Sequence, residues 1–259
     1  MFEKVQALYF SPTKTTEQVI NTLSHAFDQP VRKINITSKT NREKSYKFHP
    51  TNLTIIGVPV YAGRIPKIME TYFKTLEGNN TPTVIITVYG NRDYDDALLE
   101  MRDVLNKQNF NIIAAGAFIG QHSYTRQVGN NRPDAKDLEV VMAFAEDILE
   151  KLKNDTENDA LLPVKGNHPY RERKSGETFA PKTSNKCIHC GLCATDCPVQ
   201  VIDHDDVTKI DAEHCLHCCR CIQVCPTQAK KFEHPFIKGL VNQLIDNCGD
   251  IRKEPELFI

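Results

Sequence analysis

Two stretches near the C-terminus decide the fold of that part of the chain: CIHCGLCATDCP at residues 187–198 and CLHCCRCIQVCP at residues 215–226. Each has the spacing C-x2-C-x2-C-x3-C-P, and the second begins 28 residues after the first. Eight of the ten cysteines occupy these positions. A repeat this short predicts a small unit made of two similar halves that share one core.

This spacing resembles the motif with which bacterial ferredoxins hold two [4Fe-4S] clusters. In that motif three cysteines bind one cluster and the fourth binds the other. The ligand sets are then Cys187, Cys190, Cys193 with Cys225, and Cys215, Cys218, Cys221 with Cys197. Such a unit transfers single electrons.

Cysteines at this density have two other common uses, in zinc sites and in disulfides. Structural zinc sites need a long spacer between two cysteine pairs, whereas four cysteines lie here in one compact run. Disulfides need an oxidising compartment, and the N-terminus MFEKVQALYF lacks the pattern of a signal peptide. We therefore expect a cytoplasmic protein with reduced thiols, in which Cys219 is a packing residue and Cys248 an idle or buried thiol.

Length and charge allow one ordinary domain in front of this unit. The chain has 259 residues and a formal net charge of -1, so we expect neither nucleic acid nor a membrane surface as partner. No apolar run approaches the ~20 residues of a membrane span. We predict a front domain at 1–154, a linker at 155–183, a cluster unit at 184–234, and a C-terminal helix and tail at 235–259.

The front domain alternates short apolar runs with segments of helical period. Strands are predicted at Val5–Phe10, Val31–Ile36, Leu53–Val60, Thr83–Tyr89 and Ile112–Ile119. Helices are predicted at Thr16–Phe27, Pro66–Leu76, Tyr94–Asn106 and Asp134–Lys153. This alternation predicts an α/β fold with a doubly wound, five-stranded parallel sheet, whose ligand lies beyond the carboxyl ends of the strands.

The loop after the first strand, SPTKTT at residues 11–16, is rich in hydroxyl groups and opens a helix. Free backbone N–H groups and the positive helix end suit a terminal phosphate, although such a turn can also be a simple helix cap. The sequence here has neither a G-x-G-x-x-G nor a Walker pattern, which favours a monophosphate.

This turn resembles the flavodoxin phosphate loop, S/T-x-T-G-x-T. Ser11, Thr13, Thr15 and Thr16 stand at the hydroxyl positions, and Lys14 replaces the glycine. The resemblance implies FMN as cofactor. Lys14 either takes the backbone geometry of glycine at some cost or changes the turn, and its ammonium could contact the phosphate.

Two further loops resemble those that surround the isoalloxazine ring in flavodoxin-like proteins. The residues implied in flavin binding are Pro59, Val60, Tyr61, Ala62 and Gly63 after the third strand, and Tyr89, Gly90, Asn91, Arg92 and Tyr94 after the fourth. Tyr61 or Tyr94 could stack on the ring. Each tyrosine could instead be a half-buried residue at a strand end.

His122 follows the fifth predicted strand and is a candidate proton donor or acceptor above the flavin. The simpler interpretation is a histidine that is hydrogen-bonded at a loop end.

Nearly the whole chain resembles the 4Fe-4S binding flavodoxin family, in which a flavodoxin-like domain is fused to a two-cluster ferredoxin and which occurs in anaerobes. The resemblance extends to the ending RKEPELF at 252–258. The resemblance implies an electron-transfer protein that links two clusters, one FMN and a redox protein partner. Two alternatives stay open. One is an FMN-dependent reductase of a small substrate with His122, Arg92 and Tyr124 in its pocket, and the other is an iron–sulfur sensing module.

Overall fold

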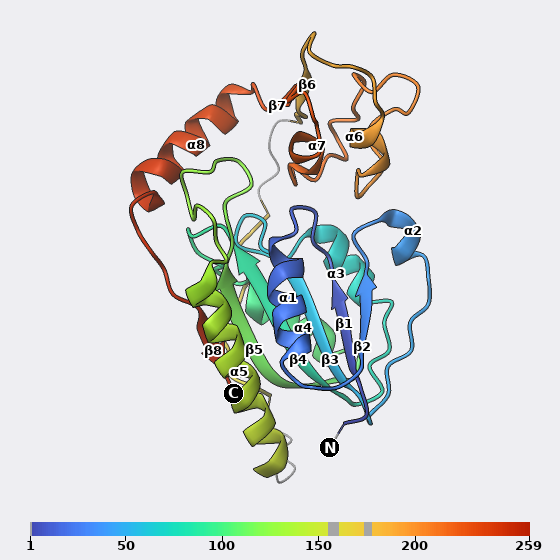
Figure 1. Ribbon diagram of the computed structural model, residues 1–259, viewed down its shortest axis with the longest axis vertical. Helices are drawn as coiled ribbons and strands as arrows, with labels where there is room; N and C mark the ends of the chain where they lie inside the picture. Colours follow the sequence, from blue (N-terminus) through green and yellow to red (C-terminus); the bar gives the residue numbers. More distant parts are fainter. Residues whose placement is uncertain (1, 155–160, 174–177) are drawn as a thin grey trace.

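The computed structural model describes residues 2–154, 161–173 and 178–259. Five parallel strands form the centre of the front domain (Figure 1): β1 (Val5–Tyr9), β2 (Val31–Asn35), β3 (Leu53–Pro59), β4 (Thr81–Tyr89) and β5 (Phe110–Ile119). Their order is β2-β1-β3-β4-β5, the flavodoxin-like order of a doubly wound sheet. The predicted fold class is confirmed.

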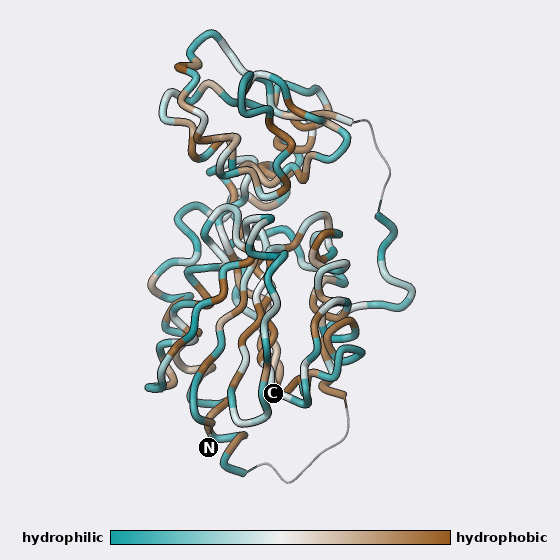
Figure 2. The backbone as a smooth tube through the Cα atoms, turned by 90° about the vertical axis from the view of Figure 1, so that its right-hand side faces the viewer, coloured by the Kyte–Doolittle hydropathy of each residue, from teal (hydrophilic) through white to brown (hydrophobic). Residues whose placement is uncertain are grey.

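Helices cover both faces of the sheet, as in all doubly wound folds. One face packs against α1 (Thr15–His25) and α5 (Ala135–Asn154), and the other against α3 (Lys67–Phe73) and α4 (Ala97–Asn106). A short helix, α2 (Lys39–Arg42), follows β2. Because the central strands are buried on both sides, their sequences are almost continuously apolar, which Figure 2 shows as brown strands.

A sixth strand at the edge of the sheet was not predicted. β8 (Glu256–Phe258) pairs antiparallel with β5, with Leu257 opposite Gly116. Three residues are too few for a recognisable sequence pattern. The added strand covers the backbone groups of β5 at residues 115–117, which would otherwise lie at an open sheet edge.

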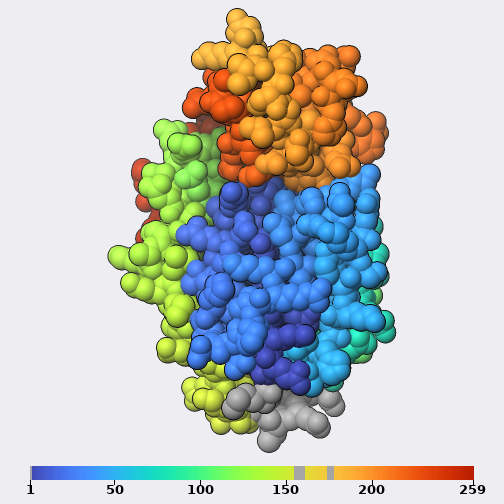
Figure 3. All heavy atoms as spheres, turned by 45° about the vertical axis from the view of Figure 1, so that its right-hand side comes forward, coloured from blue at the N-terminus to red at the C-terminus, as the bar shows by residue number. Residues whose placement is uncertain are grey.

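The cysteine-rich unit lies beyond the carboxyl ends of the parallel strands (Figure 1). It contains a two-stranded sheet of β6 (Lys182–Thr183) and β7 (Lys230–Lys231), with the single-turn helices α6 (Leu192–Thr195) and α7 (Arg220–Gln223). Figure 3 shows this unit, in orange, resting directly on the front domain, in blue. The Arg42 guanidinium in the front domain donates to the Pro198 carbonyl across the junction.

The chain returns to the front domain through α8 (Pro235–Cys248), whose presence was predicted. Leu244 and Cys248 of this helix pack against Val128 of the front domain. Beyond the helix, Arg252 forms an ion pair with Asp134 at 2.6 Å. Among the residues that the structure describes, no helix combines the length and apolar character needed to cross a bilayer.

Residues 161–173 of the predicted linker (155–183) are bound along α4. The Asp96 carboxylate accepts hydrogen bonds from the backbone N–H groups of Asn167 and Arg171, and the Tyr170 hydroxyl donates to Asp103. Residues 155–160 and 174–177 of that linker lie outside the described residues. The segment is therefore anchored by specific side chains of the front domain.

A buried ion-pair network holds the end of this segment. The Arg64 guanidinium donates twice to Glu100, at 2.7 Å for each bond, and Arg173 adds a third contact at 2.8 Å. Glu100 is 1% exposed, and its carboxylate also accepts from the Ile65 backbone N–H. Every lone-pair direction of this carboxylate is thus in use, as a buried charge requires.

Glu100→Ala is expected to lower the free energy of unfolding by about 3–5 kcal/mol, because it leaves two guanidinium groups without their buried counter-charge. Equilibrium urea denaturation measures the change. Glu146→Ala, an exposed residue of α5, is the matched control and should change stability by less than about 0.5 kcal/mol. Equal effects of the two substitutions would contradict the role of the network.

Candidate electron-transfer site

A cavity of about 50 Å³ lies where the parallel strands end. Four loops of the front domain line it with Thr13 and Thr15, with Pro59, Val60 and Tyr61, with Val88, Tyr89 and Gly90, and with Gly120, Gln121, His122 and Ser123. Cys218 of the cysteine-rich unit closes it from the other side. The topology predicts a ligand at this edge, and the structure places a cysteine of the repeat there as well.

The loop before α1 has the features of a phosphate site. Lys14 adopts a left-handed backbone (φ 67°), the conformation that the corresponding glycine would take without strain. The Ser11 hydroxyl accepts from the Glu17 backbone N–H at 3.0 Å. Thr16 is 1% exposed, and its hydroxyl has no hydrogen-bond partner among the described residues. A buried hydroxyl without a partner, at the positive end of an eleven-residue helix, fits a bound anion.

The loop after β3 folds back as a tight turn. Tyr61 and Arg64 exchange backbone hydrogen bonds, and Ala62 and Gly63 between them have positive φ angles of 52° and 81°. A side chain at Gly63 would lie 2.0 Å from the Asp95 carboxylate, so only glycine fits there. Tyr61 itself lines the cavity. Burial, followed by the nearby thiol of Cys218, raises the pKa of Tyr61 well above its usual value.

Three residues that the sequence assigned to flavin binding have other contacts. Asn91 is 1% exposed and donates to the carbonyls of Cys248 and Ile251 in the C-terminal tail. The ring of Tyr94 is fully buried and its hydroxyl donates to Glu256. Arg92 is paired with Asp95. Asn91 and Tyr94 therefore fasten the tail to the front domain, and Tyr94 has no open face on which a ring could stack.

His122 lies at the cavity with a defined tautomer. Its backbone N–H donates to Val128, and its Nδ1 accepts from the Tyr124 backbone N–H at 3.2 Å, so the ring proton is on Nε2. Burial, assisted by the positive charge of Arg92, lowers the pKa of His122 from 6.5 to about 4. The imidazole is therefore neutral at pH 7.

Protonation of His122 should couple stability to pH. Between pH 6.5 and about 4 the unfolded chain binds a proton at this residue that the folded chain does not, so stability falls as the pH decreases through this window. At pH 5.5 this effect of His122 lowers the free energy of unfolding by about 1 kcal/mol. Between pH 7.5 and 5.5 the midpoint of thermal unfolding should fall by about 2–4 °C more in the wild-type protein than in His122→Asn. Parallel curves for the two proteins would contradict this prediction.

The second half of the cysteine repeat lies near one cysteine of the first half. Cys197, Cys215, Cys218 and Cys221 line a common cavity. The pKa of the Cys218 thiol is raised to about 12, first by burial and then by the nearby thiols of Cys197 and Cys215. Cys197 thus lies beside the second motif, and the crossed ligand sets stay a prediction.

The first half of the cysteine repeat is more exposed to solvent than the second. Cys193 is buried, whereas Cys190 is exposed and is flanked by the exposed side chains of Ile188 and Leu192. The Cys225 sulfur accepts from the Ala229 backbone N–H at 3.2 Å. Hydrogen bonds of this kind favour the thiolate, the form that binds iron.

Both halves place a left-handed residue directly after their second cysteine. Gly191 has φ 76° and Cys219 has φ 63°, and each is the N-cap of the following short helix. A cysteine in a position that suits glycine costs about 1–2 kcal/mol. Cys219 is 2% exposed and is not one of the eight cysteines of the pattern.

The residues at the cavity fit the phosphate end of FMN and leave limited room for its ring. Ligand pockets usually measure about 300–1,000 Å³, and this cavity is smaller. An isoalloxazine therefore requires either a turn of Tyr61 and His122 or a shift of the cysteine-rich unit. Gly90 and Gly120 allow the loops around the cavity to pack closely, since a Cβ at Gly90 would lie 2.4 Å from the His122 ring and a Cβ at Gly120 would lie 2.9 Å from the Val88 side chain.

Five lining residues were not predicted: Val88, Gly120, Gln121, Ser123 and Cys218. Residues 120–123 follow β5, and the position of this loop beyond the carboxyl end of a parallel strand could have indicated them. No sequence pattern could have placed Cys218 at this cavity, because its position there depends on how the cysteine-rich unit packs against the front domain.

Comparison with known proteins supports this division of the chain. Residues 186–229 match the 4Fe-4S dicluster domain. A comparison with curated proteins gives no significant match. The chain therefore joins an α/β domain of flavodoxin-like strand order to a segment that matches the 4Fe-4S dicluster domain.

Similar solved structures cover the front domain. A flavodoxin from the domain Archaea matches 58% of this chain and 99% of its own at 13% identity and a TM-score of 0.41. A flavodoxin of Streptococcus pneumoniae TIGR4 matches 57% of this chain and 98% of its own at 15% identity and a TM-score of 0.39. Rubredoxin oxygen:oxidoreductase of Desulfovibrio gigas matches 58% of this chain and 36% of its own at 19% identity and a TM-score of 0.40. Because these scores are low, the fold is assigned from the strand order.

Proposed function

We propose that this protein transfers electrons between two [4Fe-4S] clusters and an FMN and exchanges them with a separate redox protein. The observation that carries the proposal is Cys218, which belongs to the cysteine repeat and lines the cavity beyond the parallel strands. When bound, the clusters supply one-electron chemistry and the flavin supplies one- or two-electron chemistry.

The residues of the chain would then have distinct tasks. Thr16 and the first N–H groups of α1 hold the phosphate, while Tyr61 and the loop 120–123 surround the ring. Cys218, with Cys197, Cys215 and Cys221, holds the cluster next to the flavin. Cys187, Cys190, Cys193 and Cys225 would hold the second cluster, and the exposed Cys190 is where a partner could approach.

The acidic loop after the first motif suits a basic partner. Asp203, Asp205 and Asp211 are exposed, and bound clusters would add negative charge. Electron exchange with such a partner should slow as the salt concentration rises. The sequence contains no nicotinamide fingerprint, which favours a protein over a dinucleotide as the source of electrons.

The position of Cys218 favours electron transfer over reduction of a small substrate at the flavin. Cys218 closes the side from which a substrate would approach, and Arg92 is engaged by Asp95. Of the three residues named for such a pocket, His122 alone lines this cavity.

Anaerobic purification with quantitation of iron, sulfide and flavin tests the proposal directly. We expect about eight irons, eight sulfides and one FMN per chain. A stepwise reductive titration should then reduce all centres with a single low-potential donor. Two zinc ions and no flavin would overturn the proposal.

A further inference from the structure

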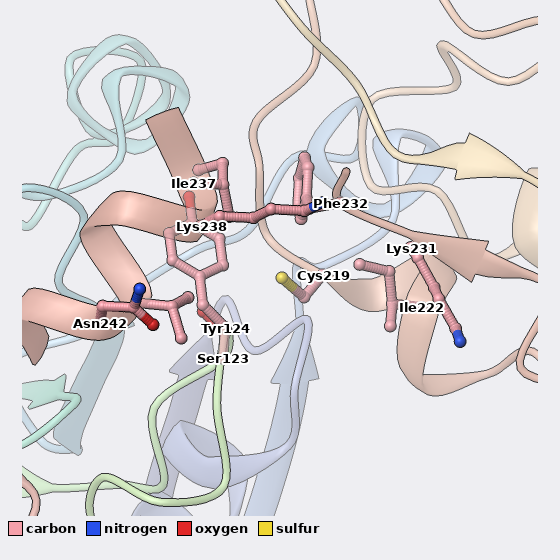
Figure 4. A pocket seen from close by; sticks show the side chains of 10 residues that line it. Ser123, Tyr124, Cys219, Ile222, Lys231, Phe232, Ile237, Lys238 and Asn242 are labelled. Carbon is pink, nitrogen blue, oxygen red and sulfur yellow. The ribbon is translucent and has the colours of Figure 1, made fainter. Parts of the chain in front are cut away.

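A second and larger cavity lies where the front domain, the cysteine-rich unit and α8 meet. It measures about 500 Å³, within the range of small-molecule pockets. Its lining consists of Ser123 and Tyr124, of Cys219, Ile222, Lys231 and Phe232, and of Ile237, Lys238, Val241 and Asn242 (Figure 4). None of these residues was assigned to the electron-transfer site except Ser123, which lines both cavities.

The inner wall of this cavity is apolar and partly aromatic. Ile237 is 4% exposed and Cys219 is 2% exposed, and the rings of Tyr124 and Phe232 meet edge to face at 5.6 Å. Figure 4 shows the Cys219 thiol directed toward Tyr124. A wall of this kind accepts a flat apolar or aromatic body.

One lysine brings positive charge to the cavity. Lys238 extends from α8 across the cavity toward Phe232, whereas the ammonium of Lys231 points away from it (Figure 4). Both lysines are exposed, and neither has an ion pair with any carboxylate among residues 2–154, 161–173 and 178–259. The Asn242 amide adds a neutral hydrogen-bonding group. The combination suits a ligand with an anionic end and an apolar body.

The position of the cavity connects it to the redox centres. Cys219 is the neighbour in sequence of Cys218, and Cys218 lines the cavity assigned to the flavin. Cys219 also keeps a left-handed backbone where the first motif has Gly191, so its side chain is held at this wall in spite of the strain.

We infer that this cavity binds a small organic carboxylate with a planar, apolar body. The carboxylate lies near Lys238, and the body lies against the wall formed by Tyr124, Phe232 and Val241. The inference goes beyond the proposed function, since it concerns residues outside the flavin cavity.

Isothermal titration of the anaerobically purified holoprotein tests the site, with cinnamate as the probe and cinnamamide as its uncharged analogue. Cinnamate should bind about five- to tenfold more tightly than cinnamamide. Lys238→Gln should remove this preference and leave the affinity for cinnamamide unchanged. Lys153→Gln, which makes the same change of charge on an exposed lysine of α5, should leave both affinities unchanged.

Val241→Trp provides a second variant that fills the cavity instead of changing its charge. It should abolish the binding of both probes while the visible spectrum of the clusters stays as in the wild type. The inference is wrong if the wild-type protein binds no cinnamate at millimolar concentration, or if Val241→Trp binds it normally. A protein without flavin that still binds cinnamate would refute the proposed function and leave this site intact.

Discussion

Cys197→Ala is expected to remove about half of the iron from the protein and to leave one cluster in place. Cys197 belongs to the first motif in sequence, but it lines the cavity that also contains Cys215, Cys218 and Cys221. The cluster lost should therefore be the one next to the flavin. Iron and sulfide analysis after anaerobic purification measures the stoichiometry.

The same substitution should interrupt electron transfer within the chain. After the remaining cluster is reduced in a flash or stopped-flow experiment, the rate of electron transfer from it to the flavin should be at least about tenfold lower than in the wild-type protein. The reason is that the cysteines nearest the proposed flavin cavity no longer hold a cluster. Cys219→Gly is the matched control, since glycine suits the left-handed backbone at that position and the residue lies outside the ligand pattern. This variant should keep about eight irons. A full complement of iron in Cys197→Ala would contradict the crossed ligand sets.

Gly90→Val is expected to weaken FMN binding about 100-fold, equivalent to about 2.7 kcal/mol. A Cβ at this position would lie 2.4 Å from Cδ2 and 3.1 Å from Cα of His122. The second contact is with backbone, so relief requires movement of the loop 120–123, which lines the flavin cavity. Titration of the flavin-free protein with FMN, followed by the quenching of flavin fluorescence, gives the affinity.

Gly239→Ala on α8 is the control for this substitution. A Cβ at Gly239 meets no atom within 4 Å, so FMN affinity should be unchanged and the helix slightly stabilised. If Gly90→Val binds FMN as the wild-type protein does, the flavin does not occupy the cavity between these loops.

The sheet could be predicted from the sequence because its strands are covered on both faces. Ile55 and Val84 lie in runs of apolar, largely β-branched residues, and such runs differ clearly from the helical periods between them. Helix ends were harder to locate. α4 begins at Ala97, after the buried Tyr94, because the preceding loop follows the contacts of Tyr94 and Asp96 rather than a helical period.

Some site residues could not be separated from structural ones in the sequence. Asn91 and Tyr94 stand in a loop that resembles a flavin loop, but their partners at Cys248 and Glu256 come about 160 residues later. Their role depends on a tertiary contact that no local pattern encodes. The cavity wall at Cys218 has the same origin, since the packing of two separately recognisable parts creates it.

The path of the chain gives the cysteine-rich unit two anchors on the front domain. It leaves through the segment fixed to Asp96 and Glu100, and it comes back through α8 to the strand beside β5. A unit held at both ends samples a small volume, so its effective concentration at the loops beyond the parallel strands is high and long excursions are disfavoured. The topology is that of an inserted module, and it argues against a swinging arm that carries electrons over long distances.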